Sequence, residues 1–582
     1  MRKHIPLLLL AVLVGTAQTH AQAANAQPYQ TPVDREQSLL TADKASPNVP
    51  LDSWIYDALD RLAAMGYIQT GSAVDRPYTR LECARLLAEA HGNIDEYDEA
   101  PMPLLKALDA EFAYETSVID GEPNTDLQLE NLYTRFTGIK GTPLRDSFHF
   151  GQSLADDYGR PYGQGLNEVS GLAARASWRK FTVYLRGEHQ YASSLPTYNA
   201  AAQAAIVAAD SLYLAGTMPF GWNLREGTTD RLRFLEAYAA VNLDNWQVSF
   251  GQQALWWGPD RSTSLILSNN AEALPMLRFA RVKPARMPGA LAFVGPVHFD
   301  LFFAREGGIH YVALGPAFQL YGSPTAALNP PPYMWGVNFS FKPTRYFELG
   351  FGHTVIFAGY GRPLTLRTFL HTFSINGNGQ AVDPGKRATE FNLNYHLPFF
   401  RRSIVAYTEG FAWDDPVQGK FVARFALSPG LYLPQLPKLN RMDLRMEGFY
   451  TDLPKLVEPA YYYYNAHYPE GYTSYGQLLG SWIGKQGRGG QATTSYWFTA
   501  RDKATVSFRR MTADKAFLQG GSMTDVTGTL SWLIRPTIEF NASGQYEQWH
   551  FPLLSAGAKN DFATTFEFKF YPKLNLMHPS RP

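Results

Sequence analysis

The chain has 582 residues, of which 52 are basic and 52 are acidic, so its formal net charge is zero. This balance lacks the basic excess of nucleic-acid-binding proteins, and we expect no nucleic-acid partner. The single cysteine, Cys83, excludes an intramolecular disulfide and a thiolate metal cluster, and we expect neither a metal nor a cofactor.

The chain opens with the pattern of a secretory signal peptide, residues 1–23. Two basic residues precede a short apolar stretch, and small residues follow at a cleavage site. This stretch is too short and wrongly flanked for a membrane anchor. Cleavage after Ala23 and cleavage after Ala26 both fit the pattern. Residues 24–48 are rich in Gln, Pro, Asn and Ala, and we expect a linker there.

Residues 49–95 have the apolar periodicity of a small helical module. Apolar residues share one helical face in the stretch 54–62, and a Gly follows where this helix would end. A second helix is predicted to begin at Thr79 and Glu82, which have the spacing of a capping box. Cys83 falls on the apolar face of that helix, so we interpret it as a core residue rather than a reactive thiol.

This module resembles a single S-layer homology module. The resemblance is carried by WIYDAL at 54–59 and by TRLE at 79–82. It implies binding to peptidoglycan-linked polysaccharide, with Arg80 as the candidate cell-wall contact. The chain departs from the family in having one copy rather than several, and the alternative is a helical plug or spacer without a ligand. Residues 96–129 are expected to form a helical connector.

Between residues 130 and 572 the hydrophobic period changes from 3.6 to 2. Apolar and polar residues alternate in FTVYLRGEH (181–189), in WQVSFGQ (246–252), and in the predicted hairpin at 335–353. Alternation alone fits both a soluble β-sandwich and a transmembrane β-barrel, because the apolar face can meet a core or lipid.

Composition and export favour the barrel over a secreted soluble β-protein. Charged residues make up 18% of the chain and aromatic residues 14%, and glycines number 48. The usual charged share is about 25%. After the signal peptide no run of apolar residues is long enough for a spanning helix. We therefore predict an all-β outer-membrane barrel of about 18 antiparallel strands, with the helical module in the periplasm.

The stretch TTFEFKFY (564–571) is predicted to be the last strand of the wall. Phe566, Phe568 and Phe570 would face lipid, and Pro572 would end the strand. The remaining residues, 573–582, do not alternate and contain further prolines. We therefore expect them to form a periplasmic tail outside the wall.

The stretch LWWGPDRSTSLILSNN (255–270) interrupts the alternation. With the preceding strand it resembles the Wzi family of outer-membrane capsule-assembly proteins. The matching positions are Gly251, the Trp-Gly-Pro at 257–259, the Leu-Ser-Asn-Asn-Ala at 267–271, and the Leu-Pro at 274–275. The resemblance implies a monomeric outer-membrane barrel that binds capsular or other surface polysaccharide and supports capsule assembly and anchoring. Polysaccharide and outer-membrane lipid are therefore the expected partners, with peptidoglycan as a further candidate.

Aromatic faces stack on sugars, and amides and hydroxyls bond to sugar hydroxyl groups. This stretch and the later tyrosine run supply both kinds of group. The alternative places the tryptophans in an aromatic girdle and lets the Ser-Asn-Asn turn satisfy its own backbone. The candidate polysaccharide-binding residues are Trp256, Trp257, Asp260, Arg261, Ser268, Asn269, Asn270, Tyr461, Tyr462, Tyr463 and Tyr464.

We find no motif typical of an enzyme: Gly-x-Ser-x-Gly, His-Glu-x-x-His and the phosphate-binding loop are absent from the sequence. We therefore predict a binding protein rather than an enzyme. The alternative function is a diffusion porin that the S-layer-like module tethers to the cell wall. A binding barrel should have its lumen blocked by long loops such as 192–232, whereas a porin should be open.

Overall fold

The computed structural model describes most of the chain after the linker. It covers residues 43–94, 98–211, 220–221, 227–308, 311–314, 319–322, 331–359, 363–373, 385–397, 404–413, 425–452, 462–464, 468, 471–572 and 574–575. The predicted signal peptide, most of the predicted linker, Tyr461 and most of the predicted tail lie outside these residues.

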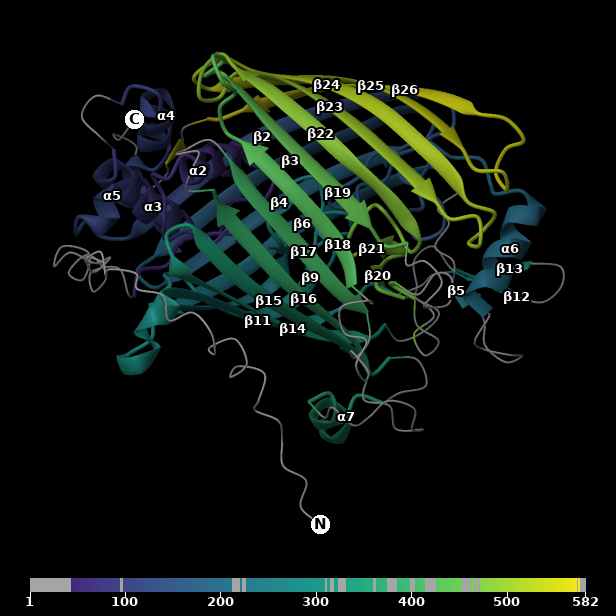
Figure 1. The fold of residues 1–582 in the computed structure, drawn as a ribbon, viewed down its shortest axis with the longest axis horizontal. Helices are drawn as coiled ribbons and strands as arrows, with labels where there is room; N and C mark the ends of the chain where they lie inside the picture. The colour runs from purple at the N-terminus through teal and green to yellow at the C-terminus, as the bar shows by residue number, and fades with distance from the viewer. Residues whose placement is uncertain are drawn as a thin grey trace, which may run out of the picture.

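Antiparallel strands form one closed barrel (Figure 1). Closure comes from β2 and β26, which pair along Leu132–Lys140 with Phe136 opposite Phe566. Eighteen strands make the wall, in agreement with the predicted number of about 18. In order around the barrel they are β2 (Thr125–Lys140), β3 (Gly165–Trp178), β4 (Phe181–Ala192), β6 (Thr229–Leu243), β7 (Trp246–Gln253), β9 (Leu274–Arg281), β11 (Pro296–Arg305), β14 (Tyr333–Thr344), β15 (Phe347–Phe357), β16 (Lys386–His396), β17 (Val405–Trp413), β18 (Phe425–Leu433), β19 (Met442–Tyr450), β22 (Gly487–Trp497), β23 (Lys503–Ala513), β24 (Gly521–Arg535), β25 (Ile538–His550) and β26 (Lys559–Phe570).

The apolar side chains of the alternating strands lie on the outside of the wall. On β26, Phe566 and Phe568 are about half exposed, whereas Glu567 between them turns inward. On β4, Val183 is exposed and its neighbour Tyr184 is buried inside. This arrangement is that of a barrel with an apolar exterior and a polar interior. The prediction of an all-β barrel of about 18 antiparallel strands is confirmed.

Four helices gather at one end of the barrel (Figure 1). They are α2 (Trp54–Ala64), α3 (Arg80–Gly92), α4 (Met102–Glu111) and α5 (Ala113–Ile119). Among the described residues, no helix has the length and apolar character needed to cross a membrane. The helices share a buried apolar cluster that also contains Trp256 and Trp497. The bundle is therefore packed against the barrel rather than attached by a linker alone.

The start of α3 agrees with the sequence pattern only in part. Thr79 caps the helix by accepting a hydrogen bond from the backbone N–H of Glu82 at 3.2 Å. The Glu82 side chain does not complete a reciprocal box, because it forms an ion pair with Arg85 at 2.6 Å. Cys83 is fully buried in the helical core, and burial raises the pKa of its thiol. An uncharged buried thiol is the core residue that the sequence predicted.

The two ends of the wall differ from the predicted boundaries. The first strand begins at Thr125 rather than at residue 130. In the tail, β27 (Leu574–Asn575) pairs with β2 opposite residues 128 and 129, although we predicted that the whole tail would lie outside the wall. The reason lies in strand length. Because β26 pairs only with residues 132–140 of β2, the start of β2 has a free edge, which the tail covers.

Shorter elements lie in the connections. These are β1 (Asp75–Arg76), α6 (Ala200–Ser211), β5 (Phe220–Gly221), β8 (Trp256–Trp257), β10 (Ala285–Arg286), the 3-10 helix η1 (Gly289–Val294), β12 (Tyr311–Leu314), β13 (Gln319–Gly322), α7 (Leu366–His371), β20 (Thr473–Ser474) and β21 (Gln477–Leu478). Most strand connections at the helical end are short, such as residues 179–180 and 244–245, although the connection 282–295 is longer. Those at the opposite end are long, such as 193–228 and 451–486.

Candidate functional site

The motif that interrupts the alternation folds into the interior of the barrel. It occupies the connection 254–273 between β7 and β9, and nearly all of this segment is buried. Trp257 is 0% exposed, donates its indole N–H to Asp300 at 3.4 Å, and packs against Phe302. Trp256 donates its indole N–H to the backbone oxygen of Asp260 at 3.0 Å. Both tryptophans therefore lie inside the barrel, not in an outer aromatic girdle.

The helical bundle reaches into the barrel to meet this motif. Strand β1, which follows α2, pairs with β8, placing Asp75 opposite Trp257 and Arg76 opposite Trp256. The backbone N–H of Gly258 extends the pairing by donating to the oxygen of Val74 at 2.9 Å. Sequence analysis did not predict this two-stranded contact, because strands of two residues have no periodicity.

Gly258 occupies a position that suits only glycine. Its φ is +122°, a conformation that L side chains rarely adopt. A Cβ there would lie 3.0 Å from the carboxylate of Glu409 and 3.2 Å from the hydroxyl of Ser264. The Gly in the Trp-Gly-Pro sequence is therefore required both by the backbone and by the close approach of the wall.

Two glutamates of the wall hold the turn that follows. Glu409 on β17 accepts hydrogen bonds from the backbone N–H of Leu265 at 2.7 Å and of Ile266 at 3.2 Å. Glu447 on β19 accepts from the N–H of Arg261 at 2.8 Å and of Ser262 at 2.9 Å. Bonds from backbone N–H groups to buried carboxylates are among the stronger hydrogen bonds in proteins. The sequence analysis missed both glutamates, although their signal is an acidic residue at an inward position of a strand.

The Ser-Asn-Asn turn binds another loop, not its own backbone alone. Ser268 donates its hydroxyl to the oxygen of Gly480 at 2.8 Å. The side-chain amide of Asn270 donates to the backbone oxygen of Leu478 at 3.2 Å, and the backbone oxygen of Asn269 accepts from the N–H of Tyr158 at 2.7 Å. Side-chain bonds of Ser268 and Asn270 thus join the motif to the connection 451–486, and a backbone bond of Asn269 joins it to the connection 141–164.

Arg261 links the motif to the helices. Its guanidinium lies 3.0 Å from Asp60 and 3.4 Å from Asp57, both on α2. Burial tends to raise the pKa of Asp60, but Arg261 and Arg76 outweigh it and lower that pKa below the ordinary value. Asp260, the neighbouring candidate, is 0% exposed. Both candidates therefore lie within the contact between motif, wall and bundle.

The tyrosine run packs on the same motif. Tyr461 lies outside the described residues, whereas Tyr462 and Tyr463 are fully buried and Tyr464 is partly buried. The hydroxyl of Tyr463 donates to the backbone oxygen of Leu265 at 2.7 Å, and the backbone oxygen of Tyr464 accepts from the indole N–H of Trp413 at 2.6 Å. The structure thus brings the two predicted sugar-binding sets together, in the packed interior rather than on an open face.

Arg80 is also engaged inside the protein. Its guanidinium lies 2.5 Å from Glu115 and 2.8 Å from Glu111, over the ring of Phe112. Burial lowers the pKa of Arg80, but these two carboxylates raise it well above its ordinary value, so the side chain stays charged. The predicted cell-wall contact would require Arg80 to give up these partners.

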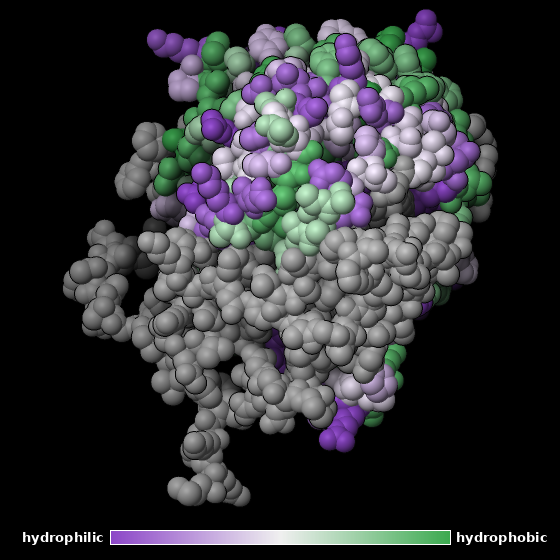
Figure 2. All heavy atoms as spheres, turned by 90° about the vertical axis from the view of Figure 1, so that its right-hand side faces the viewer, coloured by the Kyte–Doolittle hydropathy of each residue, from purple (hydrophilic) through white to green (hydrophobic). Residues whose placement is uncertain are grey.

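The lumen is filled mainly by the motif and by the connection 451–486, whose residues 471–474 and 478–486 are buried. The connection 192–232, which we expected to block the lumen, contributes Ala202 and Ile206 of α6 to the same core. Figure 2 views the long-loop end, where the described atoms form a surface of mixed hydrophilic and hydrophobic residues.

A closed wall with an apolar exterior, filled by an inner segment and covered at one end by helices, defines a transmembrane β-barrel with a filled interior. The family model described as capsule assembly protein Wzi matches residues 135–564. The chain therefore belongs to the Wzi family, as its resemblance at the motif indicated.

The chain is also similar to a solved structure and to a curated protein. A solved structure of Wzi from Escherichia coli, an outer membrane protein involved in group 1 capsule assembly and described as a carbohydrate-binding β-barrel, aligns with a TM-score of 0.65. The alignment covers 91% of this chain and all of that one at 16% identity, which shows the shared fold. An uncharacterized 55.8 kDa protein in the cps region of Klebsiella pneumoniae is 26% identical over 188 residues. That match spans 32% of this chain and 34% of the relative.

Proposed function

We propose that this protein binds surface or capsular polysaccharide at the long-loop end of the barrel and supports capsule assembly and anchoring. The observation that carries the proposal is the Wzi family match over residues 135–564. The carbohydrate-binding description of the Escherichia coli relative supports it. The chain is a non-enzymatic member of the family, so binding rather than turnover is the quantity to measure.

We further propose that the helical end faces the periplasm and the long loops face outward. Bacterial outer-membrane barrels have short turns on the periplasmic side and long loops outside. Short connections at the helical end, such as 179–180, support this orientation. A cysteine introduced at residue 557, in the loop between β25 and β26, should react with an impermeant reagent on intact cells, whereas one at residue 180 should not.

For the candidate sugar-binding residues we propose a supporting role. Trp256, Trp257 and Asn270 are buried in contacts with the wall and with the loop 471–486, so they fix the loops that present the outer surface. Direct sugar contact by these residues would require the motif to leave the lumen. The test uses a folded variant in which other tryptophans are replaced, so that Trp256 and Trp257 dominate the fluorescence. Adding polysaccharide should leave the fluorescence of this variant unchanged.

The porin alternative is tested by conductance. The packed motif and the buried loop 471–486 support a barrel that does not conduct. Purified protein in planar bilayers should show no large stable channel, while it pellets with capsular polysaccharide from the producing strain. Large stable conductance with no sedimentation would favour the diffusion porin. Heat-denatured protein is the control for nonspecific sedimentation.

Cell-wall binding by residues 49–95 is a separate proposal that rests on the S-layer resemblance. Because Arg80 is paired with Glu111 and Glu115, replacing it with Ala would disturb the bundle as well as any glycan contact. A double variant, Arg80→Ala with Glu115→Gln, removes the charge of the buried carboxylate along with that of the arginine. If the full chain pellets with purified peptidoglycan and this folded variant does so equally well, Arg80 is not the contact. If the full chain does not pellet with peptidoglycan, the spacer interpretation holds.

A further inference from the structure

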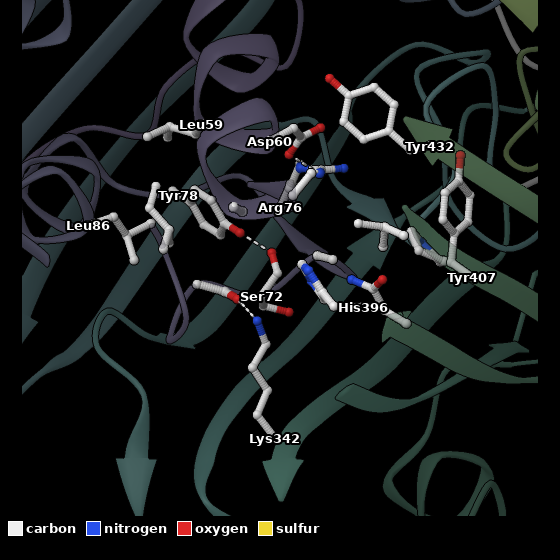
Figure 3. Close-up of a pocket in the computed structure, with 18 of the residues that line it drawn as sticks. Leu59, Asp60, Ser72, Arg76, Tyr78, Leu86, Lys342, His396, Tyr407 and Tyr432 are labelled. Atoms are coloured by element: carbon white, nitrogen blue, oxygen red, sulfur yellow. Dashed lines mark hydrogen bonds and ion pairs between the residues drawn. The ribbon is translucent and has the colours of Figure 1, made fainter. Parts of the chain in front are cut away.

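A cavity lies between the helical bundle and the inner face of the wall (Figure 3). One side is formed by α2 and the segment leading to β1, and the other by inward residues of β14 and β16 to β19. Its volume is about 60 Å³. One water molecule needs roughly 10–15 Å³ of such space, so the cavity admits a group of only a few heavy atoms.

The cavity is rich in cationic side chains. Arg76, Lys342 and Arg445 line it, whereas Asp60 is the carboxylate on its wall. Asp60 forms an ion pair with Arg76 at 2.8 Å. It forms a second ion pair at 3.0 Å with Arg261, which does not line the cavity. Asp60 is the one ion-pair partner of Arg76 among the described residues, and Arg76 shares it with Arg261 and with Arg445, which lies 3.9 Å away.

The remaining cations are more fully engaged. Lys342 donates to the backbone oxygen of Gly71 and lies 3.5 Å from Glu348. Arg445 stacks over the ring of Tyr432 at 4.0 Å and donates to the hydroxyl of Tyr407 at 3.2 Å. These contacts fix both side chains, so they supply positive potential to the cavity without being free to move.

Arg76 is the exception. Its residue is only 2% exposed, and its Nη2 bonds to Asp60. Its Nε and Nη1 have no hydrogen-bond partner among the described residues. Buried charged donors without partners are costly, and protein interiors rarely contain them. Figure 3 shows this guanidinium beside Asp60 at the cavity.

The chemistry of the free donors identifies the ligand class. A guanidinium presents a planar fork of N–H groups that matches the two oxygens of a carboxylate or phosphate. The cavity is not sealed, because Ala63, Ala73 and His396 on its walls are partly exposed. Apolar neighbours such as Leu59 and Leu86 exclude water from one side, which strengthens the attraction of an anion to Arg76.

We propose that this cavity binds an oxyanion, a carboxylate or phosphate group, through Nε and Nη1 of Arg76, with Arg445 as the second positive charge. The small volume takes the anionic group itself, and the molecule that carries it extends toward the helical end. The site is distinct from polysaccharide binding at the long-loop end and does not depend on it. An acidic sugar and a phosphate ester share this chemistry, and the probes below distinguish them.

The test is isothermal titration calorimetry of the full mature chain in detergent micelles. The probes are inorganic phosphate and glucuronate, with glucose as the neutral match for glucuronate and sodium chloride as the match for ionic strength. We expect saturable binding of phosphate, of glucuronate or of both, and none of glucose or chloride. Binding of only one probe assigns the site to that oxyanion. If neither probe gives saturable heat, the proposal is wrong.

Two variants locate the binding. Arg76→Gln removes the free donors and should weaken binding at least tenfold. Asn394→Asp places a carboxylate on the cavity wall at nearly unchanged volume and should weaken binding to a similar extent by competing for Arg76. If Arg76→Gln fails to fold, the second variant decides, because it removes no ion pair. Heat-modifiable migration on gels identifies the folded barrels.

The matched control is Arg501→Gln. Arg501 lies at the same end, over the ring of Trp54, and pairs with Glu539 at 2.7 Å, but it does not line the cavity. Its loss should leave the affinity within twofold of the parent. If Arg501→Gln weakens binding as much as Arg76→Gln, or if neither Arg76→Gln nor Asn394→Asp weakens it, the anion is attracted by general surface charge and the cavity is not the site.

Discussion

The outer face of the wall and the interior that it encloses differ in how the sequence encodes them. On the outer face, alternation within a single strand is sufficient: Phe566 and Phe568 of β26 point outward because every second residue does. In the interior, contacts join distant segments, such as Leu265 and Glu409, which are 144 positions apart. A local pattern predicts the first kind of surface and carries no information about the second.

The same difference separates the energetics of the two regions. Lipid surrounds an outward side chain on every strand and tolerates changes of shape as long as the side chain stays apolar. The interior is packed, and a change of volume or of one polar group affects several neighbours. Substitutions should therefore show a larger penalty for lost shape inside and a larger penalty for introduced charge outside.

The largest effect is expected for Trp257→Ala. Trp257 is fully buried and packs against Phe302. Removing a large aromatic from a packed core costs about 3–5 kcal/mol of unfolding free energy. Denaturant unfolding of folded barrels in lipid vesicles measures the loss. The comparison is Phe250→Leu on the adjoining strand β7, where Phe250 is 72% exposed and the volume change meets only lipid. Equal losses for the two variants would mean that Trp257 is not packed in the interior.

Gly258→Ala tests the backbone of the motif. The substitution forces an L side chain into a φ of +122° and brings its Cβ to 3.0 Å from Glu409. Strain of this kind costs about 1–3 kcal/mol. Gly528→Ala on β24 is the control, since a Cβ there meets nothing within 4 Å. The same unfolding measurement should show almost no loss for Gly528→Ala, and a comparable loss in both variants would contradict the inward position of the motif.

Much of the wall could be predicted from sequence, and little of the interior could. The strands at 181–192 and 246–253 were expected because apolar and polar residues alternate there. The resemblance at residues 255–270 identified the family, but it could not show that Trp256 and Trp257 lie in the lumen. Their burial depends on β1, which comes from a helical module far away in the sequence.

The same limit applies to charged residues. Arg80 has the residue type and spacing of a cell-wall contact, but its partners Glu111 and Glu115 lie on the next two helices. Pairing between helices depends on their packing angle, which the spacing of one motif does not fix. The charge and residue type of Arg80 could therefore be read from the sequence, but whether its partner is an external ligand or another part of the protein could not.

Phe568→Asp tests the outer face by introducing charge. Phe568 points toward lipid on the strand that closes the barrel. A carboxylate that faces lipid costs up to roughly 2 kcal/mol, depending on its depth in the bilayer. We expect a strong decrease of heat-modifiable barrel in the outer-membrane fraction.

Thr565→Asp on the inner face of the same strand is the control and should assemble better, since its side chain points into the polar lumen. The reverse ranking would mean that the faces of β26 are assigned incorrectly.

The smallest effect is expected for deletion of residues 573–582. The described part of this tail contributes β27, which adds two residue pairs to the edge of β2. A hydrogen bond at a strand edge contributes about 0.5–1.5 kcal/mol, and water can replace part of it once the edge is free. The truncated chain should therefore still form heat-modifiable barrel in the outer membrane, with unfolding free energy lower by about 1 kcal/mol. The control deletes only 576–582 and keeps β27, so its stability should match the full chain. If deletion of 573–582 blocks assembly while deletion of 576–582 does not, the two-residue pairing is needed to close the barrel, and β26 alone is not a sufficient last strand.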